Sequence, residues 1–218
     1  MSATIVIPFR GPWGAKSRLA PALAEPMRAS LALSLYRHVL AEAISAGAAP
    51  VLVVTPSGEA ASLAKRYGAS VLRETAGSLN AAVTLAAKSL NAAGIERMAV
   101  IAADLPLLES DDIAALLGAG CCDVTIAPDR AGSGTNAMAV PVAPTAAGRF
   151  GFHYGHKSLA AHRREAARLG LAELLIDRAG LAGDLDTADD LALLDHSFVR
   201  LKPELRRAIT RARKDLHV

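Results

Sequence analysis

The strongest constraint on the fold is a regular alternation of short apolar segments with longer, alanine-rich ones. Segment 98–102 consists entirely of Met, Ala, Val and Ile, and segment 50–55 has four consecutive Val and Leu residues between Pro50 and Thr55. Strands that are apolar throughout are typical of parallel sheets, where both faces are buried. Repeated strand–helix units of this kind predict an α/β protein, with a mostly parallel, right-handed sheet flanked by helices.

The same pattern predicts where the elements lie. The expected strands are 4–8, 50–55, 70–73, 98–102, 123–128, 137–142 and 172–176. The expected helices are 26–46, 59–67, 79–93, 110–117, 158–169 and a basic C-terminal helix at about 203–216. Thr187, with Asp190 three residues later, is a capping-box signature for one further helix. No linker or repeat divides the chain, so we expect a single domain over 1–218.

Composition narrows the class of protein. With 52% hydrophobic and 21% charged residues, the chain is not a disordered one. A net charge of +3 is too small to predict a nucleic-acid partner. The basic C-terminal helix is either a solvated surface or a tail that binds phosphate or a partner.

We expect a soluble, cytoplasmic protein without membrane contact. The chain opens with a short strand and a charged loop instead of a signal peptide, and no apolar run could cross a bilayer. Cys121 and Cys122 lack zinc-site spacing and are expected to be small buried residues of a reducing compartment. The alanine-rich helices permit a homodimer without requiring one.

The loop after the first strand has the residues of a phosphate site. Gly11 lets backbone amides converge on an anion, and Arg10, Lys16 and Arg18 supply positive charge. It is not a Walker A loop, because Ala15 stands where that motif has Gly before the Lys. An ordinary basic surface loop is the alternative.

Three aspartates are candidates for a metal site. Asp104 follows a buried strand, at the edge of the sheet where such folds bind ligands. Asp184 and Asp186 point the same way if their segment is extended, because side chains alternate between faces. Mg²⁺ binds a few carboxylates together with substrate phosphates. Alternatively, Asp104 caps a turn, Asp186 belongs to a helix N-terminus and Asp184 faces solvent.

Two further segments carry polar groups suited to a substrate. In 129–136, glycines allow close approach, and Ser133, Thr135 and Asn136 offer hydrogen bonds; a plain hairpin loop is the alternative. In 152–162, Gly155 and Ser158 lie at an expected helix N-terminus, which favours an anion. The histidines of that segment do not have zinc-site spacing.

Together these motifs resemble the 2-phospho-L-lactate guanylyltransferase family of coenzyme F-420 biosynthesis, which includes the phosphoenolpyruvate and 3-phosphoglycerate guanylyltransferases. The resemblance runs nearly end to end and is carried by 15–21, 79–81, 103–106, 132–136, 154–158 with His162, and 184–186. It implies a Rossmann-like, glycosyltransferase-A type nucleotidyltransferase fold with a mostly parallel mixed sheet. It also implies transfer of GMP from GTP to a phosphorylated three-carbon acid, with the product passed to a downstream transferase.

The resemblance also assigns roles by position. Asp104, Asp184 and Asp186 look like ligands of Mg²⁺, bound as two ions, and Lys16, Arg18 and Asp104 look catalytic. The contacts to the phosphorylated acid would be Thr135, Gly155 and Ser158. The nucleotide-binding residues would be Arg10, Gly11, Lys16, Arg18 and Asn80.

The sequence departs from the family pattern in three places. The usual Val-Lys after the first strand is Phe9-Arg10, and the usual Gly-Leu-Asn is interrupted in 77–80, which bears on base recognition. His153, His156 and Lys157 make the segment before Ser158 more cationic, which would suit a larger or more anionic acceptor. Two alternatives remain: a molybdenum-cofactor guanylyl- or cytidylyltransferase, and a non-catalytic nucleotide-binding protein of the same fold.

Overall fold

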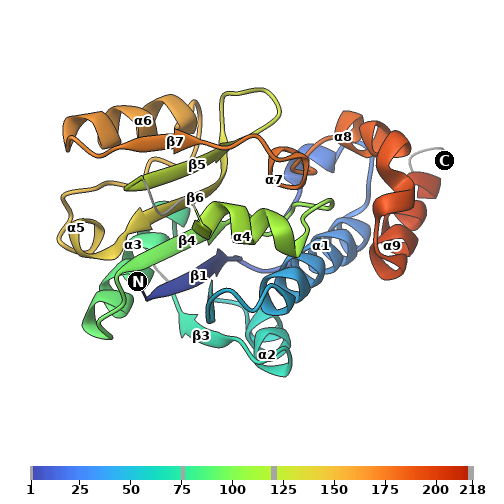
Figure 1. Cartoon of the computed structure of the whole chain (residues 1–218). Coiled ribbons are helices and arrows are strands. Elements are labelled where there is room, and N and C mark those ends of the chain that lie inside the picture. The colour runs from blue at the N-terminus through green and yellow to red at the C-terminus, as the bar shows by residue number, and fades with distance from the viewer. Residues whose placement is uncertain (1, 75–76, 119–121, 216–218) are drawn as a thin grey trace.

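The computed structural model describes residues 2–74, 77–118 and 122–215. Its centre is a seven-stranded sheet in the order β3-β2-β1-β4-β6-β5-β7 (Figure 1). The strands are β1 (Ala3–Pro8), β2 (Val51–Thr55), β3 (Ser70–Arg73), β4 (Arg97–Ile101), β5 (Val124–Pro128), β6 (Thr135–Pro141) and β7 (Glu173–Leu175). Every strand expected from the sequence is present.

One strand runs against the others. β6 is antiparallel to both β4 and β5, whereas the remaining pairs are parallel. The prediction of a mostly parallel mixed sheet is therefore confirmed. Because β6 is reversed, its first residues, Thr135 and Asn136, lie at the edge where β1 and β4 end. The Ala102 N–H donates to the Asn136 carbonyl at 2.8 Å, which fixes this juxtaposition.

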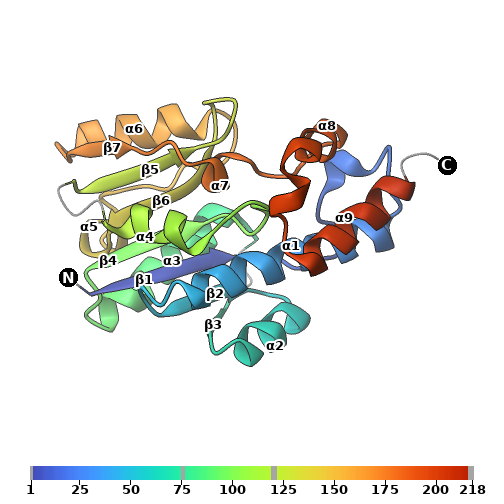
Figure 2. The same cartoon turned by 45° about the vertical axis from the view of Figure 1, so that its right-hand side comes forward.

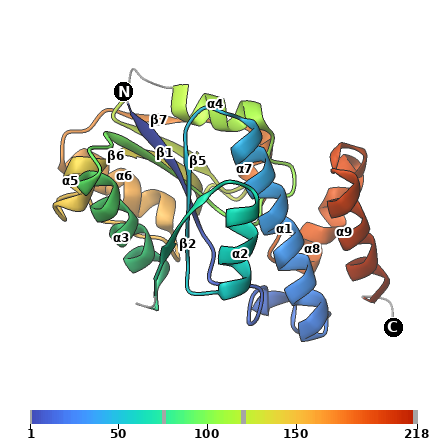
Figure 3. The same ribbon diagram turned by 90° about the horizontal axis from the view of Figure 1, so that it is seen from below.

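Helices cover both faces of the sheet. One face packs against α1 (Glu25–Ser45), α2 (Gly58–Arg66), α4 (Ser110–Gly118) and α7 (Ala179–Ala182). The other packs against α3 (Leu79–Ala92), α5 (Val142–Ala146) and α6 (Ser158–Arg168), and Figure 3 shows the two layers from below. Ile5 and Ile7 of β1 face the first layer and Val6 the second, which explains why the strand is apolar at every position.

The C-terminal segment packs on α1, away from the sheet. It consists of α8 (Ala188–Leu193), the 3₁₀ helix η2 (Leu194–Arg200) and α9 (Pro203–Asp215), and Figure 2 shows α9 running alongside α1. Leu31 and Leu35 of α1 belong to the same buried cluster as Leu205 and Ile209 of α9. The expected C-terminal helix is confirmed up to residue 215, and residue 216 lies outside the described residues.

Several details differ from the sequence-based expectation. The short helices α5 and α7 were not predicted, and neither were η2 and the 3₁₀ helix η1 (Ser17–Leu19). Thr135 and Asn136 belong to β6, not to the preceding loop. Cys122 is partly exposed, so its predicted burial is wrong, and Cys121 lies outside the described residues. Among the described helices, none is long and apolar enough to cross a membrane.

Candidate active site

Two adjoining pockets open at the edge where the strands end. The first, of about 590 Å³, lies between the loop after β1, the start of α3 and the loop after β4. The second, of about 390 Å³, lies between the 129–136 segment, the start of α6 and the 184–186 segment. Leu79 and Asp186 line both pockets. A ligand in one pocket can therefore meet a ligand in the other beside Asp186.

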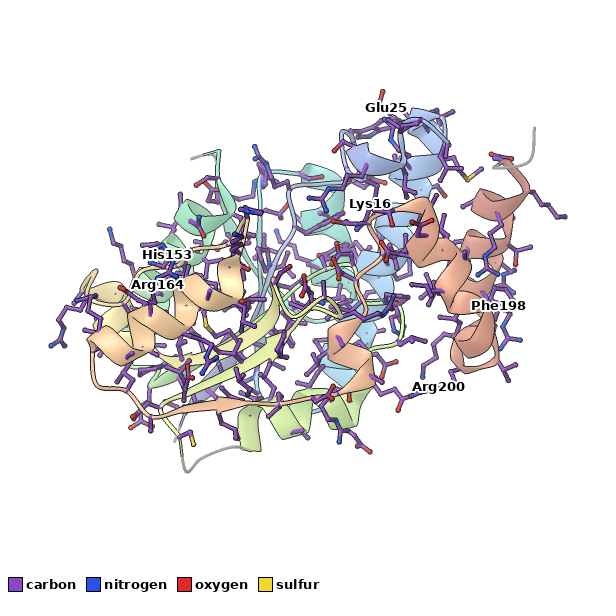
Figure 4. The ribbon with its side chains drawn as sticks, turned by 90° about the horizontal axis from the view of Figure 1, so that it is seen from above. Lys16, Glu25, His153, Arg164, Phe198 and Arg200 are labelled. Carbon is purple, nitrogen blue, oxygen red and sulfur yellow. The ribbon has the colours of Figure 1, made fainter. Side chains whose placement is uncertain are left out.

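Lys16 is the buried cation of this site. Its side chain is only 6% exposed, and Nζ lies 2.5 Å from Asp104 Oδ2 and 2.9 Å from Asp186 Oδ1. Figure 4 shows Lys16 beside the C-terminal segment that carries Asp186. Burial alone would lower the pKa of Lys16, but the two carboxylates outweigh it and raise that pKa. Lys16 therefore remains charged at neutral pH.

The backbone at Lys16 has an uncommon conformation. Lys16 has φ 54°, and among the described residues Lys157, also at φ 54°, is the other non-glycine residue with a positive φ. Lys16 precedes η1 and Lys157 precedes α6, and each lines a pocket. Such conformations cost free energy and occur often at ligand sites.

The three aspartates predicted to share a site do lie together. The Leu185 N–H donates to the Asp104 carbonyl at 3.1 Å, which places the 184–186 segment beside the loop after β4. The predicted Thr187–Asp190 capping box is confirmed, and the Asp186 N–H makes an additional hydrogen bond to Asp190 Oδ2 at 3.0 Å. That helix start thus holds the backbone of Asp186 in place.

Asp184 experiences the charge of the other two aspartates. Burial raises its pKa above the ordinary value, and the negative charges of Asp104 and Asp186 add to that effect. A hydrogen bond from Asn136 Nδ2 at 3.2 Å acts in the opposite direction. An additional cation between these side chains would therefore offset the repulsion that Asp184 experiences.

The donor chemistry fits Mg²⁺, although the described residues contain no set of three or more acidic, His or Cys side chains arranged to hold a metal ion. The ammonium of Lys16 lies between Asp104 and Asp186. Mg²⁺ usually binds one or two carboxylates and completes its shell with water and substrate phosphates. The carboxylates of Asp104 and Asp186 line the first pocket, and those of Asp184 and Asp186 line the second, so a ligand phosphate bound in either pocket would have carboxylates beside it.

The second pocket contains all three residues predicted to bind the phosphorylated acid. Thr135, Gly155 and Ser158 line it, together with the cationic Arg18 and Lys157. Ser158 is the first residue of α6, whose N-terminus carries partial positive charge. The Leu159 N–H donates to the Ser133 carbonyl at 3.1 Å and so holds α6 against the 129–136 segment.

Asn80 makes a different contact from the one predicted. Its Nδ2 donates to the Tyr154 carbonyl at 3.2 Å, and its Oδ1 accepts from the Tyr154 N–H at 2.8 Å. Among the described residues that line the two pockets, Leu79 is present and Asn80 is not. Asn80 thus ties α3 to the segment before α6, and its contact with the base stays a prediction.

The other residues predicted to bind the nucleotide line the two pockets. Arg10, Gly11 and Lys16 line the first pocket. Arg18 lines the second, is 73% exposed and reaches Asp186 Oδ2 at 3.3 Å. Sequence reasoning missed Trp13, which lines the first pocket and is 67% exposed. A large apolar residue within a loop of glycines and cations was the available signal.

A comparison with solved structures gives the fold class. A protein of Desulfovibrio desulfuricans G20, named as a nucleotide-diphospho-sugar transferase, has the same fold with a TM-score of 0.76. The superposition covers 100% of this chain and 98% of that one, at 18% sequence identity. At this identity the likeness shows the fold alone, and it confirms the predicted fold class.

The sequence comparisons give the particular family. The protein-family model described as "Guanylyl transferase CofC like" matches residues 3–197 of the chain. The phosphoenolpyruvate guanylyltransferase of Rubrobacter xylanophilus is 38% identical over 200 residues, covering 90% of this chain and 95% of that protein. The 3-phospho-D-glycerate guanylyltransferase of Phenylobacterium zucineum is 35% identical over 194 residues, covering 86% and 87%. The chain therefore belongs to the CofC-like guanylyltransferase family, as the motifs predicted.

Proposed function

We propose that this protein transfers GMP from GTP to a phosphorylated three-carbon acid, with Mg²⁺ and release of pyrophosphate, in coenzyme F-420 biosynthesis. The observation that carries this proposal is the pair of pockets that share Asp186 and Leu79. A two-substrate transfer needs adjoining sites of this kind. The named activities of the relatives supply the substrate class.

The first pocket suits the nucleotide. Phe9, Trp13 and Leu79 give it apolar surface for a base, while Arg10 and Lys16 give it positive charge for phosphates. Planar bases are bound by apolar and aromatic surfaces, and phosphates by cations and backbone amides. GTP would thus extend from the loop after β1 toward Asp186.

The second pocket suits the acid. Its phosphate would lie at the N-terminus of α6, where Ser158 and backbone amides favour an anion. Thr135 and Gly155 line the same pocket. Phosphoenolpyruvate, 3-phosphoglycerate and 2-phospho-L-lactate all combine a phosphate with a carboxylate on three carbons, and these are the acceptors we propose.

The transfer needs no covalent enzyme intermediate. An oxygen of the acceptor phosphate attacks the α-phosphorus of GTP, a new P–O bond forms, and the bond to pyrophosphate breaks. The attacking oxygen is already ionised, so no general base has to remove a proton. The product, a guanosine-diphospho-acid, would go on to a downstream transferase.

The protein has to overcome repulsion between two polyanions. Lys16 and Arg18 would stabilise the charge that develops on the departing pyrophosphate. Asp104, Asp184 and Asp186 would hold Mg²⁺, which offsets phosphate charge when bound. Holding both substrates against Asp186 also supplies the proximity that a bimolecular reaction lacks.

The proposal is tested by a matrix of four NTPs against 2-phospho-L-lactate, phosphoenolpyruvate and 3-phosphoglycerate, read as pyrophosphate release. We expect release with GTP and at least one acid, and none when EDTA removes divalent cations. Molybdopterin serves as the rival acceptor. Release with molybdopterin and with none of the three acids would contradict the proposal.

A further inference from the structure

A buried histidine lies behind the wall of the second pocket. The side chain of His162, in α6, is fully buried and lies between β6 and the segment before α6. Its Nε2 is 2.9 Å from the backbone nitrogen of His153, and its Nδ1 is 3.0 Å from Thr135 Oγ1. Figure 4 shows His153 beside α6. One ring therefore contacts two of the segments that shape the pocket.

These two contacts fix the tautomer of His162. A backbone N–H can only donate, so Nε2 must accept and carries no proton. In a neutral ring the proton then sits on Nδ1, and Nδ1–H donates to Thr135 Oγ1. Burial, with a smaller contribution from the charge of His153, lowers the pKa of His162 to about 4. The ring is therefore neutral at physiological pH.

The tautomer in turn limits what the Thr135 hydroxyl can do. Since Oγ1 accepts from His162, its own proton cannot point at the ring and is free to be donated elsewhere. Thr135 lines the second pocket, although the residue as a whole is only 8% exposed. The hydroxyl is thus prepared as a donor toward an anionic ligand in that pocket.

We infer that His162 is a positioning residue that orients the Thr135 hydroxyl to donate to the phosphorylated acid, an inference that rests on the proposed function. Through the His153 N–H, the same ring also anchors the segment that leads to Gly155 and Ser158. The ring of Tyr154 packs edge-on against His162, with centroids 4.9 Å apart, and keeps the imidazole in its plane. His162 does not line either pocket in the described part of the chain, so it would act only through its partners.

Matched substitutions separate the two bonds of His162. In His162→Asn the side-chain amide reaches the place of Nδ1 and can still donate to Thr135. In His162→Gln the amide reaches the place of Nε2 and can serve His153 but not Thr135. Thr135→Val removes the hydroxyl itself and keeps its shape.

We expect His162→Gln and Thr135→Val to raise the KM for the acid by about tenfold, the effect of one lost hydrogen bond of this strength. The KM for GTP should change less than about twofold, and His162→Asn should lie nearer to wild type. The double variant His162→Gln/Thr135→Val should be no worse than Thr135→Val alone. Equal changes in both KM values, or losses that multiply in the double variant, would overturn the inference.

The tautomer itself can be observed without turnover. A long-range ¹H–¹⁵N NMR spectrum of the full chain should show the His162 proton on Nδ1, and Thr135→Val should shift that Nδ1 signal. A proton on Nε2 overturns the inference even if the enzyme is active. If the proton is on Nδ1 but the wild-type protein turns over none of the acids, the proposed function is contradicted instead. The Thr135 hydroxyl would then be oriented as described, but the ligand assigned to it would be wrong.

Discussion

The ammonium of Lys16 lies 2.5 Å from a carboxylate oxygen of Asp104, although the two residues are 88 positions apart in the chain. The same nitrogen is 2.9 Å from Asp186, 170 positions away. One buried cation therefore ties the loop after β1 to the loop after β4 and to the start of α8. The fold and the active site share this contact.

Loss of Lys16 should therefore affect stability as well as activity. Lys16→Met leaves Asp104 and Asp186 facing each other without the cation, and an uncompensated charge is costly. Because these carboxylates are 27% and 34% exposed, we expect the free energy of unfolding at pH 7 to fall by only about 1–3 kcal/mol. Chemical denaturation measures this. Lys88→Met on the exposed side of α3 is the control, and an equal effect of the two substitutions would contradict the structural role.

The conformation of Gly11 should be essential to the loop after β1. Gly11 has φ 123°, and a Cβ there would lie 2.9 Å from Ser57 Cβ. Gly11→Ala should cost about 1–3 kcal/mol of stability and raise the KM for GTP. Gly14, at φ 73° with open space around it, provides the control, because Gly14→Asn suits that conformation. Matching thermal unfolding curves for the two variants would contradict this account of the loop.

Trp13 should report nucleotide binding directly. It is the single tryptophan of the chain and lies exposed at the first pocket. A bound guanine would change its surroundings, so GTP should change the intrinsic fluorescence in a saturable way. The acid alone should change it little, and Trp13→Phe should remove the signal. An unchanged spectrum at GTP concentrations that saturate turnover would place the base elsewhere.

The buried His162 should make the fold sensitive to acid. Its folded-state pKa of about 4 lies below the ordinary 6.5, so the unfolded chain takes up the proton first as pH falls. The stability is complete above pH 6.5, and up to about 3 kcal/mol is lost between pH 6.5 and 4. Chemical denaturation of wild type and His162→Asn across this range measures the difference. If the free energy of unfolding changes with pH in the same way in both proteins, His162 does not titrate as described.

Glu165, which lies near His162, also contributes to the stability of the fold, and this contribution is lost at a lower pH than that of His162. Hydrogen bonds from Arg168, opposed by burial, lower the pKa of Glu165 to about 2 from an ordinary 4.5. Its stabilisation is therefore present above about pH 4.5 and declines below it. Wild type and His162→Asn both keep Glu165, so its contribution appears in both curves, and the part of the range above pH 4.5 gives the clearest reading of the imidazole. His153, which also faces the ring, is retained in both proteins as well.

The sheet could be predicted because its strands are apolar on both faces, as Ile5, Val6 and Ile7 illustrate. The clustering of Asp104 with Asp184 and Asp186 was expected from the family resemblance, because the residue pattern alone places Asp104 at the ligand edge and leaves the position of the 184–186 segment open. Local pattern and the rules of α/β topology are sufficient for the sheet. The short helices α5 and α7 have too few residues for a periodic pattern.

Contacts set by the three-dimensional path of the chain could not be predicted. The sequence assigned Lys16 to phosphates, but it does not reveal that carboxylates 88 and 170 positions away neutralise the ammonium. Thr135 was expected in a loop, because the reversal of β6 leaves no mark on the residues that begin it. The bond between His162 and Thr135 likewise depends on how α6 packs on β6.

The turnover of Asp104→Asn is the most direct test of the site at Asp104, Asp184 and Asp186. It is measured as pyrophosphate release at saturating GTP, acid and Mg²⁺. The substitution removes one negative charge and preserves the shape of the side chain. We predict a loss of at least about tenfold, equivalent to roughly 1.4 kcal/mol of barrier, with unchanged circular dichroism. Asp111→Asn, on the exposed side of α4, should retain full activity. Wild-type turnover in Asp104→Asn would contradict the proposed catalytic centre.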